Sequence, residues 1–168
     1  MNTVRKVLTI AGLTVCAALS GLAQEEGKVV TAQASKFVNL PGLPTCATAS
    51  VQRGDPTKGG AVLLAKLKAG CMVPWHWHTA TESLMIVSGI AKVQMKDAGT
   101  TNSLAPGDYV FMPGKHVHQF TCVSGCTFFI AIEGAFDIHY VDKDGKEIPI
   151  DQAIAPHKMP SPKTAPKK

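Results

Sequence analysis

The chain has 168 residues, of which 45% are hydrophobic and 17% are charged, and its formal net charge is +5 at pH 7. This length supports one hydrophobic core and excludes two independent ones, so we expect a single domain with appendages. The excess positive charge comes from Lys and Arg at the two ends, and residues 24–157 are near neutral. The basic composition therefore does not predict a nucleic-acid partner, and none is expected.

Residues 1–23 have the pattern of a bacterial export signal. Arg5 and Lys6 precede a mostly apolar run from Val7 to Leu19, and the small residues needed for cleavage follow at Gly21-Leu22-Ala23. The apolar run is short for a membrane span, so a retained N-terminal anchor is the weaker alternative. We expect a periplasmic or secreted protein without a stable membrane anchor after cleavage.

Residues 24–59 are polar and carry two turn signals, Pro41-Gly42 and Gly54-Asp55-Pro56. Short strands are predicted at 36–40 and 48–52. We expect this segment to supply N-terminal strands and loops that pack on the domain formed by residues 60–155.

Residues 60–155 predict an all-β barrel or sandwich, because short strand-like runs recur there between Gly and Pro residues. The predicted strands are 61–68, 71–78, 83–87, 90–95, 109–112, 116–121, 127–132, 136–141 and a last one near 147–150. The sequence predicts a polar turn at residues 97–103, and a weak helical pattern is found only at residues 151–155. Residues 156–168 are mainly Pro, Lys, Ser and Thr, which predicts disorder.

Two pairs of histidines carry the clearest functional pattern. His76 and His78 share one face of a predicted strand, and Glu82 follows after a short turn. Neutral imidazoles and a carboxylate are typical ligands of first-row transition metals. His116 and His118 repeat the spacing on a later strand. A lone histidine is more often a surface or core residue, but four of the six histidines fall in these pairs. We expect one divalent metal ion per chain, and the residues leave open which histidine of the second pair binds.

These motifs resemble those of the cupin family, and the chain is similar to small single-domain bacterial cupins that are secreted and have no assigned activity. The first cupin motif, G-x5-H-x-H-x3-E-x6-G, is matched at every required position by Gly70, His76, His78, Glu82 and Gly89. The second motif, G-x5-P-x-G-x2-H-x3-N, is matched in part by Gly107, Pro113 and His118. Its second glycine has moved to Gly114, Lys115 stands in the vacated position, and Cys122 replaces the final asparagine.

The resemblance covers about residues 60–141 and implies a cupin-type β-barrel, a double-stranded β-helix or jelly roll. It implies the metal ligands His76, His78, Glu82 and His118. His116 then remains either an acid–base group beside the metal or a residue at the barrel mouth that meets solvent. A homodimer is also expected by analogy with the family.

An apolar pocket beside the metal is expected from strand parity. Met72 shares the face of His76, Leu84 and Ile86 share that of Glu82, and Phe120 follows His118 inward. Ordinary core packing is the alternative for these four residues.

Four cysteines lie outside the expected export signal, and an oxidising compartment would favour their pairing. Cys122 and Cys126 could close a short hairpin at Gly125, and Cys46 with Cys71 is the remaining pair. Buried free thiols are the alternative.

Three functions are compatible with such a site. The first is a metal-dependent, dioxygenase-like oxidoreductase that acts on a small oxygen-donor substrate, such as a phenolic, diketone or thiol compound. The second is non-enzymatic binding or sensing of a metal or small ligand. The third is a redox-neutral lyase or isomerase reaction. The nitrogen and oxygen donors suit Fe, Mn, Ni, Cu or Zn and do not choose among them.

Overall fold

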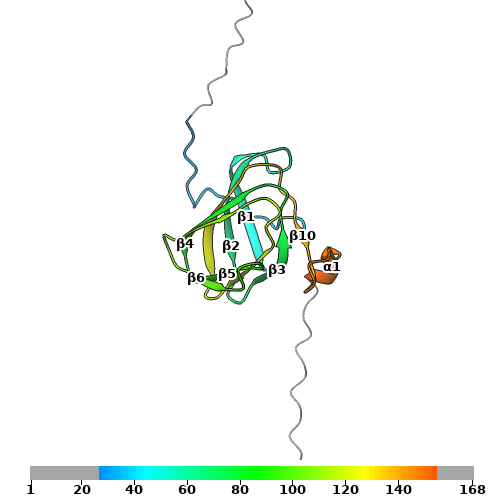
Figure 1. Ribbon diagram of the computed structural model, residues 1–168. Helices are drawn as coiled ribbons and strands as arrows, with labels where there is room; N and C mark the ends of the chain where they lie inside the picture. The colour runs from blue at the N-terminus through cyan, green and yellow to red at the C-terminus, as the bar shows by residue number, and fades with distance from the viewer. Residues whose placement is uncertain (1–26, 155–168) are drawn as a thin grey trace, which may run out of the picture.

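The computed structural model describes residues 27–154, and its regular structure is almost entirely β (Figure 1). The predicted export signal (1–23) and the predicted disordered tail (156–168) lie outside the described residues. Between residues 27 and 154, no helix has the length and apolar character that a membrane crossing requires.

Two antiparallel five-stranded sheets face each other and enclose the core. Sheet 1 has the strand order β1-β2-β9-β4-β7, with β1 at Ala47–Gly54, β2 at Ala61–Leu67, β9 at Cys126–Ile132, β4 at Glu82–Ser88 and β7 at Tyr109–Met112. Sheet 2 has the order β10-β3-β8-β5-β6, with β10 at His139–Tyr140, β3 at Met72–Trp77, β8 at His118–Cys122, β5 at Ala91–Met95 and β6 at Thr101–Leu104. The predicted all-β barrel class is confirmed.

Strand β9 shows how the sequence builds this core. It lies in the middle of sheet 1, between β2 and β4. Every second side chain of the strand is buried, namely Cys126, Phe128, Ile130 and Ile132. Because successive strand residues point to opposite faces, this alternation places one apolar row against sheet 2. Burying one large apolar side chain stabilises the fold by about 1.5 to 3 kcal/mol relative to leaving it exposed.

The N-terminal segment is part of the barrel and not only a layer on it. β1 pairs with β2 along its whole length and forms an edge of sheet 1. The strand predicted at 36–40 is reduced to one isolated bridge, between Val38 and Ala49. The predicted strand 48–52 lies within β1.

Three other elements differ from their predictions. β6 falls inside and just after the predicted polar turn at 97–103, because its outward side chains are polar and it pairs only with β5. The strand predicted at 136–141 is limited to the two residues of β10, and the one near 147–150 to an isolated bridge between Val141 and Glu147. The helix α1 spans Ile150–Ala153 and lies outside the barrel beside β10 (Figure 1).

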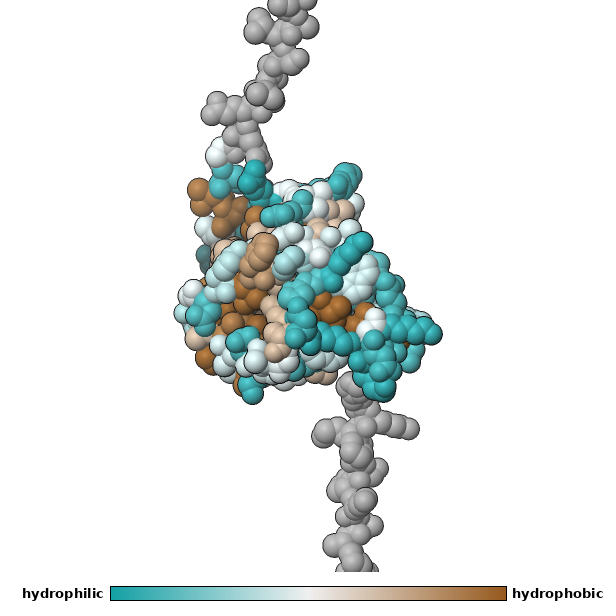
Figure 2. Space-filling model, viewed as in Figure 1, coloured by the Kyte–Doolittle hydropathy of each residue, from teal (hydrophilic) through white to brown (hydrophobic). Residues whose placement is uncertain are grey.

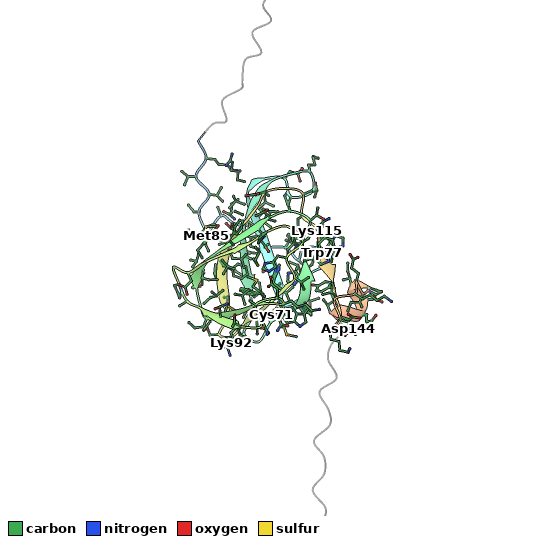
Figure 3. All side chains as sticks on the ribbon, viewed as in Figure 1. Cys71, Trp77, Met85, Lys92, Lys115 and Asp144 are labelled. Atoms are coloured by element: carbon green, nitrogen blue, oxygen red, sulfur yellow. A yellow bond between two sulfur atoms is a disulfide. The ribbon has the colours of Figure 1, made fainter. Side chains whose placement is uncertain are left out.

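Two disulfides tie the chain together, Cys46–Cys71 and Cys122–Cys126. The first joins the start of β1 to the turn before β3, and the second closes the hairpin between β8 and β9. Figure 3 shows Cys71 at one end of the barrel and Trp77 toward the other.

The outer surface mixes hydrophilic side chains with apolar areas on the face shown in Figure 2. Among the described residues, the large apolar side chains that stay more than half exposed include Tyr109 and Phe111, both on β7. The homodimer expected from the sequence stays a prediction.

Candidate metal centre

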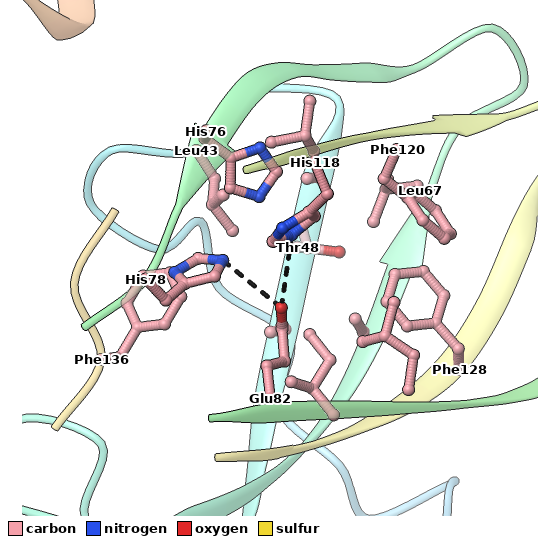
Figure 4. A pocket seen from close by; sticks show the side chains of 16 residues that line it. Leu43, Thr48, Leu67, His76, His78, Glu82, His118, Phe120, Phe128 and Phe136 are labelled. Carbon is pink, nitrogen blue, oxygen red and sulfur yellow. Dashed lines mark ion pairs between the residues drawn. The ribbon is translucent and has the colours of Figure 1, made fainter. Parts of the chain in front are cut away.

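Four donor side chains meet at one end of the barrel (Figure 4). His76 lies on β3, His78 directly follows that strand, His118 begins β8, and Glu82 begins β4. All four are buried, with at most 6% of each residue exposed. The imidazoles therefore belong to sheet 2 and the carboxylate to the facing sheet 1.

The distances between these donors are short. One ring nitrogen of each of the three histidines lies within 4.8 Å of the others. An oxygen of Glu82, Oε2, is 3.4 Å from Nε2 of His78 and 3.7 Å from Nε2 of His118. The structure thus brings together the four ligands that the cupin resemblance implied, and the three histidines form the tightest group.

A bulge in β3 decides which of its residues face inward. Val73 pairs with Phe120 and His76 pairs with His118, so two residues of β3 stand opposite one residue of β8. The bulge brings both Val73 and His76 to the inner face. If the residues of β3 alternated without a bulge, Met72 would share the face of His76 and line the pocket, as predicted. This prediction is wrong. Met72 is 36% exposed and does not line the cavity.

Main-chain carbonyls orient all three imidazoles. The Nδ1–H group of each ring donates a hydrogen bond to a carbonyl oxygen: His76 to Pro74 at 2.6 Å, His118 to His116 at 2.8 Å, and His78 to Asp137. A carbonyl can only accept, so each Nδ1 carries the proton and each Nε2 keeps its lone pair. Such outer hydrogen bonds are typical of metal-ligating histidines, because they fix both the tautomer and the ring orientation.

Burial sets the protonation of the group. Burial lowers the pKa of His76 well below its usual value, and the neighbouring imidazoles of His118 and His78 lower it further. Burial also lowers the pKa of His118, to about 4. It raises the pKa of the Glu82 carboxyl, against the opposing effect of His78. At neutral pH, His76 and His118 are neutral and offer lone pairs, which is the form that binds a divalent transition metal.

The donors face a small cavity of about 50 Å³. Its other walls are mainly apolar and include Val73, Leu84, Phe120 and Phe128. Among the described residues that line it, no ionisable side chain is present besides the four donors.

Two of the four predicted pocket residues line this cavity, namely Leu84 and Phe120. Ile86 is buried in the core but does not line it, because it lies one alternation further along β4 and Phe128, its partner on β9, occupies that part of the wall. With Met72, it is the second pocket prediction that the structure corrects.

The structure does not bring His116 into the cavity. β8 begins only at His118, so the strand face that was expected to carry both histidines is absent at residue 116. The His116 ring bonds through Nε2 to Oδ1 of Asp97 at 2.9 Å, and 27% of the side chain is exposed. His116 instead contributes its carbonyl to the orientation of His118. The predicted acid–base role beside the metal loses its geometric basis.

The turn before β8 explains how the altered second motif still delivers His118. Lys115 has a positive φ of 66°, so it adopts the left-handed conformation that glycine usually supplies. A Cβ atom on Gly114 would lie 2.5 Å from the carbonyl oxygen of Thr79, which requires glycine there. The Lys115 N–H donates to the His78 carbonyl at 2.7 Å, and Figure 3 shows Lys115 near Trp77.

Trp77 does not line the cavity, and its ring stacks on His139 with 3.9 Å between ring centroids. Sequence reasoning missed most of the residues that shape the site, among them Leu43 and Phe136, which line the cavity, and Asp137, whose carbonyl orients His78. These three residues lie outside regular strands, although a strand was predicted at 136–141.

Comparisons with known proteins agree with this geometry. The chain matches the family described as ChrR Cupin-like domain over residues 25–135. A DNA damage-repair/toleration protein of Arabidopsis thaliana is 32% identical over 94 residues, which make up 56% of this chain and 29% of that protein. The chain thus spans less than a third of this relative's length.

Solved structures show the same fold. The polyketide cyclase RemF from Streptomyces resistomycificus has a TM-score of 0.58 and 19% identity, over 71% of this chain and 90% of that one. The DMSP lyase DddQ from Ruegeria pomeroyi has a TM-score of 0.55 and 19% identity, over 68% and 64%. An RmlC-like cupin from Shewanella frigidimarina has a TM-score of 0.54 and 15% identity, over 72% and 97%.

At these identities the solved structures establish the fold alone. Within a cupin fold, the three-histidine cluster supports a metal-binding protein with a small-molecule ligand, and it does not identify the metal. The family match covers well over half of the chain, and the first motif, the barrel and the buried donor set all agree with it. This chain belongs to the ChrR cupin-like domain family.

Proposed function

We propose that this protein is an exported, metal-dependent enzyme of the dioxygenase type that acts on a small molecule with an oxygen donor. One observation carries the proposal: four buried donors face a single, mostly apolar cavity at one end of the barrel. A divalent iron, manganese, nickel, copper or zinc ion bound there supplies Lewis acidity or, for the redox-active metals, electron exchange with dioxygen.

The protein's own residues bind and orient. His76, His78 and His118 present Nε2 atoms from rings that are held by carbonyls, so little reorganisation is needed on binding. Glu82 adds an oxygen from the opposite sheet. Phe120 and Phe128 pack with 4.9 Å between ring centroids and close the far wall against water.

The absence of a separate proton carrier favours this reaction class. The described lining of the cavity contains no acid or base besides the donors themselves. A reaction that depends on a dedicated general acid or base would need such a group within hydrogen-bond reach of the substrate. Oxidation by dioxygen depends on it less.

The disulfides support the export part of the proposal. All four cysteines of the described residues are paired. Disulfides persist in the periplasm and outside the cell and are rare in a reducing cytosol. Fractionation of cells together with the mass of the purified protein tests this part. A protein that keeps residues 1–23 and stays in the cytosol would contradict it.

Dioxygen uptake tests the activity. Protein loaded separately with iron, manganese, nickel, copper or zinc is mixed with a panel of small phenolic, diketone and thiol compounds in an oxygen electrode. We expect uptake with at least one redox-active metal, none with zinc, and none for His76→Ala. Lack of uptake by every fully loaded form would contradict the dioxygenase proposal.

A redox-neutral lyase or isomerase is the second candidate, and the position of Glu82 favours it. Glu82 lies outside the three-histidine group, so it can serve as a base while the histidines alone hold a metal. Structures with this fold include one named a lyase and one named a cyclase. This candidate predicts anaerobic turnover, and it predicts that Glu82→Gln keeps the metal but loses the reaction.

Non-enzymatic binding remains the third candidate, because the cavity is small. Its volume of about 50 Å³ is far below the roughly 300 to 1,000 Å³ typical of drug-sized ligand pockets. Stoichiometric binding of metal and ligand with no turnover under either aerobic or anaerobic conditions would favour the binding protein over both enzymes.

A further inference from the structure

A second hollow lies outside the metal cavity and on the other side of one aromatic ring. This outer cleft has a volume of about 390 Å³ and is bordered by residues 40–42, 56–57 and 136–138 and by Ile150 at the start of α1. The linings of the cleft and of the metal cavity have a single residue in common, Phe136. The Phe136 side chain therefore borders both the small metal cavity and the larger outer cleft.

The Phe136 ring stands directly beside a donor. Its centroid is 5.4 Å from that of the His78 ring, and Figure 4 shows it below His78, at the edge of the site. The Phe136 N–H donates to the Pro56 carbonyl at 2.7 Å. On the other side, the Asp137 carbonyl accepts from His78, and Oδ1 of Asp137 accepts from the Thr79 N–H at 2.8 Å.

These contacts hold the backbone on both sides of Phe136 while the ring itself makes no hydrogen bond. Rotation of this side chain would therefore leave the backbone hydrogen bonds on both sides of it intact.

The chemistry of the two spaces is complementary. The metal cavity has room for only a few water-sized groups, which is enough for a donor head and not for a ring or chain. The cleft is lined mainly by apolar side chains, including Leu40, Pro41, Ile138 and Ile150, with Thr57 and Asp137 as its polar members. It can hold an apolar body whose donor end extends past Phe136.

We propose that the outer cleft is the binding subsite for the apolar part of the ligand and that Phe136 is the gate between this subsite and the metal centre. The inference rests on the proposed function in requiring a metal-bound ligand. It assigns the ligand class: a small oxygen-donor head, such as an enolate, phenolate or carboxylate, attached to one ring or a short apolar chain.

The test uses the purified protein loaded with Co²⁺. The visible absorption of the bound cobalt ion reports ligand binding. Two bidentate oxygen-donor probes are compared by stopped-flow: acetohydroxamate, which has only a methyl group, and benzohydroxamate, which adds a ring. We expect the wild-type protein to bind benzohydroxamate at least tenfold more tightly. Phe136→Ala should raise the association rate of benzohydroxamate at least tenfold, with unchanged cobalt content.

Two further variants separate the gate from the subsite. Ile150→Trp fills the cleft from its rim and should weaken benzohydroxamate binding about tenfold while leaving acetohydroxamate binding as it is. Phe111→Ala, which removes a ring that is 54% exposed on β7, is the matched control and should behave as wild type. Phe136→Leu replaces Phe136→Ala if the smaller side chain prevents folding.

The outcomes are distinct. Wild-type binding constants and rates in both the Phe136 and Ile150 variants would overturn the gate and the subsite, and they would leave the proposed function standing. If the variants change hydroxamate binding as expected but the wild-type protein catalyses no reaction, the result would support the gate and count against the enzyme. A wild-type protein that binds neither cobalt nor any of the five metals named above would overturn both proposals.

Discussion

The inward nitrogen of each metal-site histidine is selected by a carbonyl on the other side of its ring. These carbonyls belong to Pro74, His116 and Asp137, which lie in three separate segments of the chain. Because a carbonyl is present whatever the side chain, the orientation of the donors does not depend on the side-chain chemistry of these three residues. Their positions in the backbone matter more than their identities.

His118 and His116 provide a direct test of this distinction. Replacing His118 by Ala removes a donor, so we expect metal affinity to fall by more than about 100-fold, the upper end of the loss seen when an outer-sphere partner is removed. His116→Ala keeps the carbonyl and should retain the metal and its turnover within about threefold. Metal analysis, a chelator competition and rate measurements check both variants.

The contrary result would be informative. If His116→Ala kept its metal and lost most of its turnover, the ring that now bonds to Asp97 would have to reach the substrate during the reaction.

The buried histidines also predict how the metal-free protein responds to acid. The pKa of His118 falls to about 4 in the fold and that of His76 falls as well, whereas histidines in the unfolded chain titrate near 6.5. As the pH drops below about 6.5, the unfolded chain binds more protons at these groups, and the free energy of unfolding decreases. Glu82, whose pKa is raised, acts in the opposite direction.

The two imidazoles together change the free energy of unfolding more than the one carboxyl does. The urea concentration at the unfolding midpoint of the metal-free protein should therefore be lower near pH 5 than near pH 7. Urea titrations at both pH values measure the effect, and His118→Gln should reduce it. Equal midpoints, or an effect that His118→Gln leaves unchanged, would contradict this prediction.

At the scale of elements, the turn before β8 carries strain that one substitution can remove. Lys115 adopts a positive φ, which is unfavourable for a residue with a Cβ atom. Lys115→Gly should therefore raise the free energy of unfolding by about 1 kcal/mol. Gly114→Ala should lower it by about 1 to 3 kcal/mol, because its Cβ atom would collide with the Thr79 carbonyl.

Chemical denaturation of the two variants, compared with the wild type, gives both values. If Lys115→Gly were the less stable variant, contacts of the lysine side chain would outweigh the backbone strain.

The same elements show how far the sequence could be read. Alternation identified strands such as β9, and the spacing of the first motif identified His76, His78 and Glu82, because both patterns follow from strand geometry. Alternation could not reveal the bulge in β3, because the bulge depends on pairing with β8. Alternation therefore placed Met72 on the wrong face. Phe136 and the carbonyl of Asp137 act from a loop that the sequence pattern had assigned to a strand, so their inward position could not be predicted.

At the scale of the whole molecule, the two disulfides differ in the length of chain that they close. Cys46 and Cys71 are 25 residues apart, whereas Cys122 and Cys126 are four apart. In the chain-entropy account, these loops correspond to about 3.5 and about 2 kcal/mol of stabilisation. We expect the paired Ala substitution of Cys46 and Cys71 to lower the urea midpoint more than that of Cys122 and Cys126. The reverse order would point to lost packing around the hairpin.

The facing arrangement of the donors has a consequence for the lifetime of the protein. A bound ion shared by the three imidazoles next to sheet 2 and the carboxylate of sheet 1 would link the two sheets, and it would have to be released before they could separate. Each tenfold rise of free metal above its Kd then adds about 1.4 kcal/mol to the free energy of unfolding. Metal-starved copies should open more often and be cut faster in pulse proteolysis, so the abundance of the protein would follow the metal supply of its compartment.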